Sequence, residues 1–196
     1  MKYRIWGTGL LPWLALFALM TPVLAGQAQV PRVSEEAARD FKIFTGRVQQ
    51  YIKLQKNLEA SLPGLKPTKD VARIVEHQRA LARKIADARR GARQGDIFTH
   101  EVAERFRKII RSEFRGPEGR LARRTIQPDE PSKVMVRLHV NDVYPDNLAL
   151  ITTPPTLLSK LPPLPQELAY RIVGRDLTLK DTKAELIVDL IPNAVP

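Results

Sequence analysis

The chain of 196 residues contains no cysteine. This absence excludes disulfide bonds, a zinc site built on thiolates, a cysteine nucleophile and lipid attachment through an N-terminal cysteine. Aromatic residues are also few, at 6%, so the chain offers little surface for stacking on nucleic-acid bases. Only one long apolar run is present, near the N-terminus, and 27% of the residues are charged. This composition excludes a polytopic membrane protein and argues against wholesale disorder.

The apolar run extends over residues 10–24 and follows a short segment with two positive charges, at Lys2 and Arg4. Small residues then occur at the spacing that signal peptidases accept, which places cleavage after residue 25 or 28. We therefore predict a signal peptide over residues 1–25 and a periplasmic or secreted mature protein. The alternative is an uncleaved inner-membrane anchor, but the run is shorter than the ~20 residues that span a bilayer. Membrane contact is expected only through this segment, if it stays uncleaved.

Residues 32–115 are predicted to form a helical region with three amphipathic helices, over 34–62, 68–92 and 99–115. In each range, apolar residues recur at steps of three and four, which places them on one face of a helix. Gln55 occupies the one polar position in the first apolar stripe. Thr68 and Thr99 are predicted to cap the second and third helices. Because none of the three helices is apolar all round, each must bury its stripe against another element.

Residues 116–133 contain three prolines and two glycines, and they are predicted to be a linker. Residues 134–196 are predicted to form a small β-rich region. Alternating apolar residues indicate antiparallel strands over 134–140, 168–173, 176–180 and 185–191. Gly174 supplies the tight turn of a hairpin, and one helical turn is expected within 156–161. The predicted fold class is therefore α+β.

Positive charge is concentrated in the helical region. Residues 32–115 carry 20 basic and 11 acidic groups, a net charge of +9, whereas residues 134–196 carry six and seven, a net charge of −1. The densest basic stretch lies around the end of the second predicted helix. It supplies the candidate anion-binding residues Arg79, Arg83, Arg89, Arg90 and Arg93, whose guanidinium groups suit phosphates and carboxylates. No aromatic residues are interleaved with them, so specific nucleic-acid binding is not favoured.

No catalytic or metal-binding pattern accompanies these arginines. The three histidines fall on different predicted elements, at spacings that match no metal site: His77, His100 and His139. Four acidic residues of the β-rich region have the spacing of solvent-facing hairpin positions: Asp176, Asp181, Glu185 and Asp189. The sequence therefore predicts no catalytic residue, no metal ligand and no cofactor.

Two parts of the chain carry patterns seen in other proteins. The first comprises HQRALA at 77–82, GDIFT at 95–99 and FRKII at 106–110, and the second comprises LAYRIVGRDLTLKD at 168–181 with LIVDLI at 186–191. Both resemble a group of exported bacterial proteins that carries no assigned function. The hairpin pattern YRxVGxD is also similar to the C-terminal module of small periplasmic proteins akin to the nickel/cobalt-homeostasis regulator. That similarity implies metal handling, for which this chain has no clustered ligands.

These observations predict a non-enzymatic envelope protein, such as a scaffold, an adaptor or a chaperone-like binding module with an unidentified protein partner. A first alternative is a binder of anionic envelope polymers or nucleic acid that uses the arginines of the basic stretch. A second alternative is an enzyme whose site lies at the sheet and the proline-rich loop, lined by Asp142, Tyr144, Asp176 or Asp181.

Overall fold

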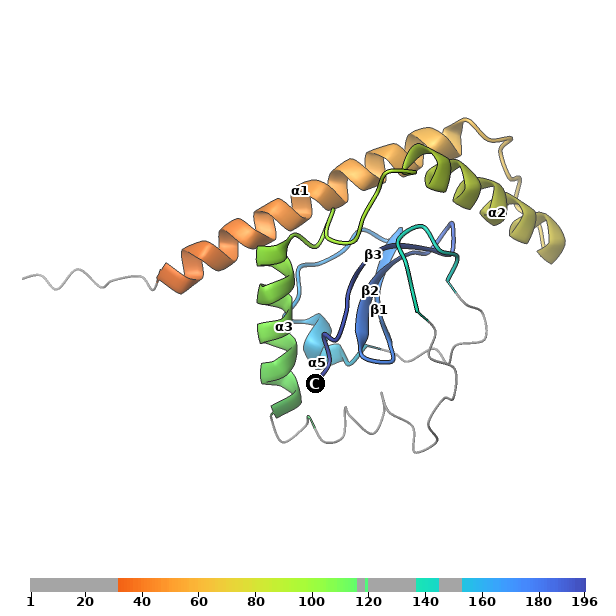
Figure 1. Cartoon of the computed structure of the whole chain (residues 1–196). Coiled ribbons are helices and arrows are strands. Elements are labelled where there is room, and N and C mark those ends of the chain that lie inside the picture. Colours follow the sequence, from red (N-terminus) through yellow and green to blue (C-terminus); the bar gives the residue numbers. More distant parts are fainter. Residues whose placement is uncertain (1–31, 116–118, 120–136, 145–152) are drawn as a thin grey trace, which may run out of the picture. The chain divides into compact units, whose positions relative to one another are not determined.

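The structure is a computed structural model that describes residues 32–115, 119, 137–144 and 153–196. Within these ranges, three long helices precede a three-stranded antiparallel sheet, which confirms the α+β class (Figure 1). The helices are α1 (Arg32–Ala60), α2 (Val71–Ala88), α3 (His100–Arg115) and the single turn α5 (Pro155–Leu158). The strands are β1 (Leu168–Val173), β2 (Asp176–Asp181) and β3 (Leu186–Ile191). The predicted signal peptide and, apart from residue 119, the predicted linker lie outside the described residues.

Helices α1 and α3 begin and end within two residues of the predicted bounds, but α2 is shorter than predicted. Asp70 caps it instead of Thr68, because the Asp70 Oδ1 accepts hydrogen bonds from the backbone N–H groups of Ala72 and Arg73 at 3.0 and 3.4 Å. The Thr68 hydroxyl accepts the N–H of Asp70 and so supports the cap from outside the helix. Thr99 precedes α3, as predicted, and its hydroxyl lies 3.5 Å from the N–H of Val102.

The three strands form a meander in which β1 pairs with β2 and β2 pairs with β3. Gly174 joins β1 to β2 with a φ of +59°, the left-handed conformation that glycine adopts at low cost, so the predicted hairpin turn is confirmed. The pairing of β2 with β3 shifts in register between Leu179 and Lys180. In β3, Val188 and Ile191 belong to the buried cluster that includes the helices, and Ile187 and Leu190 belong to a second cluster.

The strand predicted over 134–140 is wrong for its described part, since residues 137–140 are not in a strand; residues 134–136 lie outside the described ranges. Asn141 adopts a φ of +70° and Asp142 accepts the N–H of His139 at 2.8 Å, which turns the chain. Backbone hydrogen bonds join Asn141 and Asp142 of this turn to Ile187 of β3, and an isolated antiparallel bridge follows between Val143 and Leu186. The alternation of apolar residues is real, but the Asn-Asp turn redirects the backbone before a ladder forms.

The main core lies between the helices and one face of the sheet. Phe44 of α1, Phe106 of α3 and Tyr170 of β1 are buried, and their ring centroids lie 5.2–6.3 Å apart. Aromatic rings at such separations attract one another beyond the area that they bury. Residues of the turn region, Leu138 and Tyr144, cover the other face over Ile187 and Leu190. Both faces of β2 and β3 are therefore buried, and every residue of β3 is.

Candidate functional site

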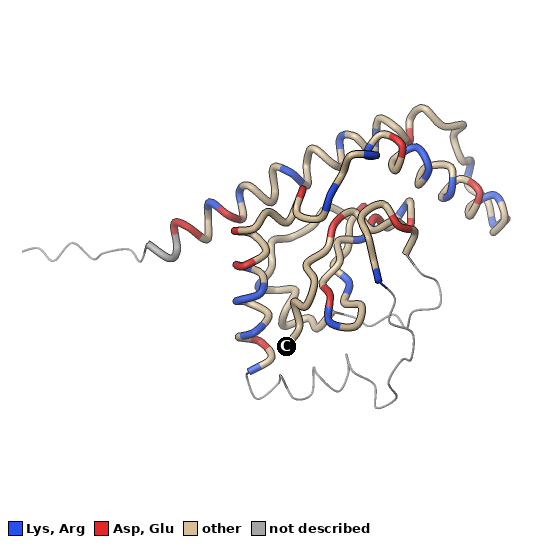
Figure 2. Tube along the Cα trace, viewed as in Figure 1, with Lys and Arg blue, Asp and Glu red and all other residues tan. Residues whose placement is uncertain are grey.

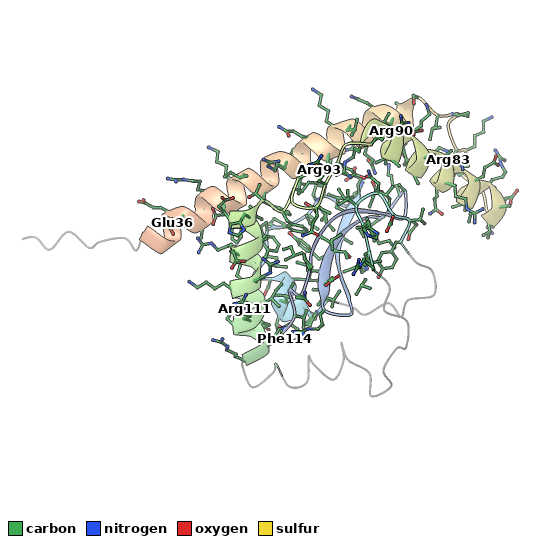
Figure 3. The ribbon with its side chains drawn as sticks, in the orientation of Figure 1. Glu36, Arg83, Arg90, Arg93, Arg111 and Phe114 are labelled. Atoms are coloured by element: carbon green, nitrogen blue, oxygen red, sulfur yellow. The ribbon has the colours of Figure 1, made fainter. Side chains whose placement is uncertain are left out.

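Four of the five candidate arginines are exposed. Arg79 and Arg83 are one helical turn apart on α2, and Arg90 and Arg93 follow in the segment after the helix. Arg83, Arg90 and Arg93 are labelled in Figure 3. We call these four residues the exposed arginines. Basic residues recur along α2 and continue into this segment, as the blue positions in Figure 2 show. The periodicity of the helix thus gathers guanidinium groups on its outer side, as residues three, four and seven apart share a face.

The exposed arginines are mostly without intramolecular partners. Arg90 contacts Asp87 at 3.0 Å, but both side chains are largely exposed and such a surface pair contributes little. Among the described residues, no carboxylate lies within 4.0 Å of the charged groups of Arg79, Arg83 or Arg93. Their donors face solvent and are available to an anion.

Arg89, the fifth candidate, does not lie with the other four. Its guanidinium donates to the side chain of Asn141 at 3.2 Å and to the carbonyl of Val188 at 3.0 Å. It also lies 5.1 Å from the ring centroid of Tyr51. Burial lowers the pKa of Arg89, although the group stays protonated. Arg89 therefore joins the end of α2 to α1 and β3, a structural role that the sequence did not indicate.

Cations and carboxylates together line a hollow between α1 and α3, which we call the α1–α3 hollow. Two of its four acidic residues accept hydrogen bonds from arginines: Asp40 accepts from the Arg105 Nε at 3.0 Å, and Glu104 accepts from Arg107 at 2.8 Å. Four cations of the hollow have no described carboxylate within 4.0 Å: Arg39, Lys108, Arg111 and Arg115. Figure 3 labels Arg111 on α3 and Glu36 on α1. The sequence predictions did not single out these cations as a site; the i, i+3 and i+7 spacing of residues 108, 111 and 115 was the available signal.

The acidic residues that were predicted to face solvent include two that are fully buried, Asp181 and Asp189. Asp181 accepts from the Tyr51 hydroxyl at 2.7 Å, from Gln55 at 3.1 Å, and from the N–H groups of Lys183 and Ala184 at 2.8 Å each. The hydrogen bond from Gln55 to Asp181 explains why a polar residue occupies the apolar stripe of α1. Burial, together with the adjacent Asp181 carboxylate, raises the pKa of Tyr51 well above its ordinary value.

Asp189 also accepts four hydrogen bonds, and all four donors are backbone N–H groups. Its Oδ2 accepts from the N–H groups of Ile97 and Phe98 at 2.8 Å each, and its Oδ1 accepts from Gly95 at 3.0 Å and Leu190 at 2.8 Å. Four donors saturate this carboxylate, so it fastens the segment between α2 and α3 to β3. The prediction that Asp181 and Asp189 are solvated is wrong, because donors distant in sequence replace water: side chains of α1 at Asp181, and backbone N–H groups of the segment before α3 at Asp189.

The residues suggested for a catalytic site at the sheet are not brought together. Asp181 lies beneath α1, Asp176 accepts the N–H of Asn193 at 2.9 Å, and Asp142 holds the turn at His139. Tyr144 is buried against the other face of the sheet, where burial raises the pKa of its hydroxyl and Lys180 lies 4.4 Å from its ring centroid. None of these residues lines the α1–α3 hollow.

The remaining sequence expectations concern metals and membranes. The described ranges hold no group of three or more histidine, cysteine, aspartate or glutamate side chains arranged to bind a metal ion. The part of the chain with described coordinates also has no helix with the length and apolar character needed to cross a bilayer. Comparison with family models, with curated proteins and with solved structures finds no match. The resemblance to exported bacterial proteins therefore stays a prediction.

Proposed function

We propose that this chain is an exported binding protein of the cell envelope, which holds an anionic polymer through the exposed arginines of α2 and the segment after it. The observation that carries the proposal is the set of outward guanidinium groups without carboxylate partners at Arg79, Arg83 and Arg93. The predicted signal peptide supports the location, because it would deliver these groups to a compartment rich in phosphate- and carboxylate-bearing polymers.

The charge pattern favours a polymer over a single small anion. The exposed arginines follow one side of a helix and continue past its end, so they offer successive contacts to an extended chain of charges. Each contact at solvent-exposed sites is weak, and affinity grows with the number of contacts and of counterions released. Binding of this kind depends steeply on salt and little on the identity of the polymer.

Heparin, a soluble polyanion, serves as the probe. We expect the R79Q/R83Q variant to elute from heparin resin at lower salt, with the slope of log K against log salt smaller by about two. The matched control is K42Q/K53Q, which removes two exposed cations from α1. Unaltered retention of R79Q/R83Q, or an equal shift in the control, would contradict the proposal.

A second candidate function, an adaptor that binds a protein partner, is supported by the α1–α3 hollow. Carboxylates and cations both line it, together with the apolar side chain of Ile43. A mixed lining suits a protein segment better than a uniformly charged polymer, since a polyanion would meet the carboxylates of Glu36 and Glu101. The test is a photo-crosslinker at Ser112 in exporting cells: one discrete adduct, lost on charge reversal by R111E, supports the adaptor. The absence of a discrete adduct contradicts the adaptor function.

A further inference from the structure

The apolar stripe of α2 is used by the fold over only half its length. Leu81, Ala82 and Ile85 in the second half are buried in the main core. The same stripe continues toward the N-terminus at Ile74 and Val75, which are only partly buried and join neither buried cluster of the described residues. Helical periodicity requires these positions to share a face. The first half of α2 therefore presents an apolar edge that lies outside both buried clusters of the described residues.

Two exposed apolar side chains extend this edge. Val71, the first residue of α2, is 69% exposed, and Leu65, in the connection from α1, is 37% exposed. We call Leu65, Val71, Ile74 and Val75 the apolar edge. Isolated exposed apolar residues are ordinary on protein surfaces, but a stripe that leaves the core and ends in the most exposed large apolar side chain of the described residues marks a contact surface.

Cations outnumber acidic residues around the apolar edge. Lys66, Lys69 and Arg73 are exposed beside it. Of the two acidic residues in this stretch, Asp70 directs its carboxylate to the N–H groups that begin α2 and is used there as the cap, and Glu76, next to Val75, is exposed. An apolar edge flanked by cations is complementary to a surface with negative headgroups over an apolar interior.

We propose that the first half of α2 docks on an anionic phospholipid surface, with the apolar edge entering the interface and the three flanking cations contacting lipid phosphates. A soluble polyanion such as heparin would contact the cations, but it has no apolar interior in which Val71 and Leu65 could be buried. An anionic lipid surface would contact both the cations and the apolar residues. This contact is independent of the predicted signal peptide, and it goes beyond the polymer binding proposed for the exposed arginines.

The absence of cysteine allows a direct test, because a single introduced cysteine carries a single probe. We would label V71C with an environment-sensitive fluorophore in protein recovered from cells that export the whole chain. The matched control is L158C, since Leu158 is 41% exposed and lies on α5. Vesicles of 70:30 phosphatidylcholine and phosphatidylglycerol should shift the emission of V71C to the blue and leave L158C unchanged. Equal shifts at both positions, or none at V71C, would overturn the proposal.

Sedimentation with the same vesicles separates lipid docking from polymer binding. L65S/V71S and K66Q/K69Q/R73Q should each bind at least about five-fold less than the unmodified chain, whereas V143S/L158S, which alters exposed apolar residues elsewhere, should bind equally. L65S/V71S should keep its heparin elution, because it removes no charge, and R79Q/R83Q should lose heparin retention more than vesicle binding. Vesicle binding that survives L65S/V71S overturns lipid docking while leaving polymer binding intact.

A second copy of the chain is the competing occupant of the apolar edge. Sedimentation equilibrium across a concentration series distinguishes it without lipid: a dimer that L65S/V71S abolishes would assign the edge to self-association and overturn lipid docking. A monomer that binds anionic vesicles, and binds pure phosphatidylcholine vesicles several-fold less, is the result expected from lipid docking.

Discussion

At the scale of single residues, two buried aspartates organise the described structure. Asp181 receives the hydroxyl of Tyr51 and the amide of Gln55 from α1, and Asp189 receives backbone N–H groups from the segment before α3. A buried carboxylate without such partners is strongly destabilising, whereas a saturated one specifies a single arrangement of the groups around it. Asp189 also sets the position of Phe98, whose ring stacks 5.4 Å from that of Phe44 in the main core.

We expect Asp189→Ala to lower the free energy of unfolding by about 3 kcal/mol or more, because it leaves buried N–H groups without an acceptor. The measurement is urea unfolding of the variant and the unmodified chain. Asp87→Ala is the matched control, since Asp87 is exposed and pairs only with Arg90 at the surface, and it should change stability by about 0.5 kcal/mol at most. Similar losses in the two variants would refute the anchoring role of Asp189.

At the scale of elements, lysine–glutamate pairs join parts of the chain that are distant in sequence. Lys160, after α5, pairs with the buried Glu113 of α3, and Lys56 of α1 pairs with the buried Glu167 before β1. The hydrogen bond from the lysine lowers the pKa of each glutamate below its ordinary value. Such a carboxyl contributes stability above the pKa of the unfolded chain, and that contribution is lost as the pH falls through the folded pKa.

Lys160→Met should therefore lower the free energy of unfolding by about 1 kcal/mol at pH 7. The difference in unfolding free energy between this variant and the unmodified chain should shrink below about pH 4. At that pH the glutamate becomes protonated in the unfolded chain, so its ionised form no longer stabilises the fold fully. Urea unfolding at pH 7 and pH 3 measures both values. Lys84→Met is the control, because Lys84 is exposed and has no described carboxylate within 4.0 Å. A difference that is constant with pH would show that the pair adds nothing through charge.

At the scale of the whole molecule, charge and secondary structure divide at the same boundary. The helical region holds a net charge of +9 and the β-rich region −1, and both proposed anion contacts lie in the helical region, on α2 and the segments that flank it. The sheet instead contributes burial on both faces of β2 and β3, and acceptors for distant segments. This division favours a protein whose sheet is a scaffold and whose helices meet the partner.

Export of the whole molecule predicts a processed N-terminus. Mass spectrometry of protein taken from the envelope should find Gly26 or Gln29 as the first residue. A25F/A28F should leave the segment attached, because large side chains block the small-residue positions before both scissile bonds. V30F, which lies beyond both sites, should be processed normally. Recovery of the chain from the cytosol with Met1 or its initiator-cleaved end would contradict export.

Local patterns in the sequence were enough to predict three helices and the hairpin at Gly174, because each depends on neighbours a few residues apart. The excess of positive charge follows from composition alone. Only the tertiary structure decided that Arg89 bonds to Asn141 and Val188 within the protein and is not exposed with the other candidate arginines. It also decided that residues 137–140 are not a strand and that the α1–α3 hollow exists. It also buried Asp181 and Asp189, through partners 130 and 91 residues away. A lone acid inside the apolar run of β3 was the local sign of such burial, but its partners come from segments that periodicity cannot bring together.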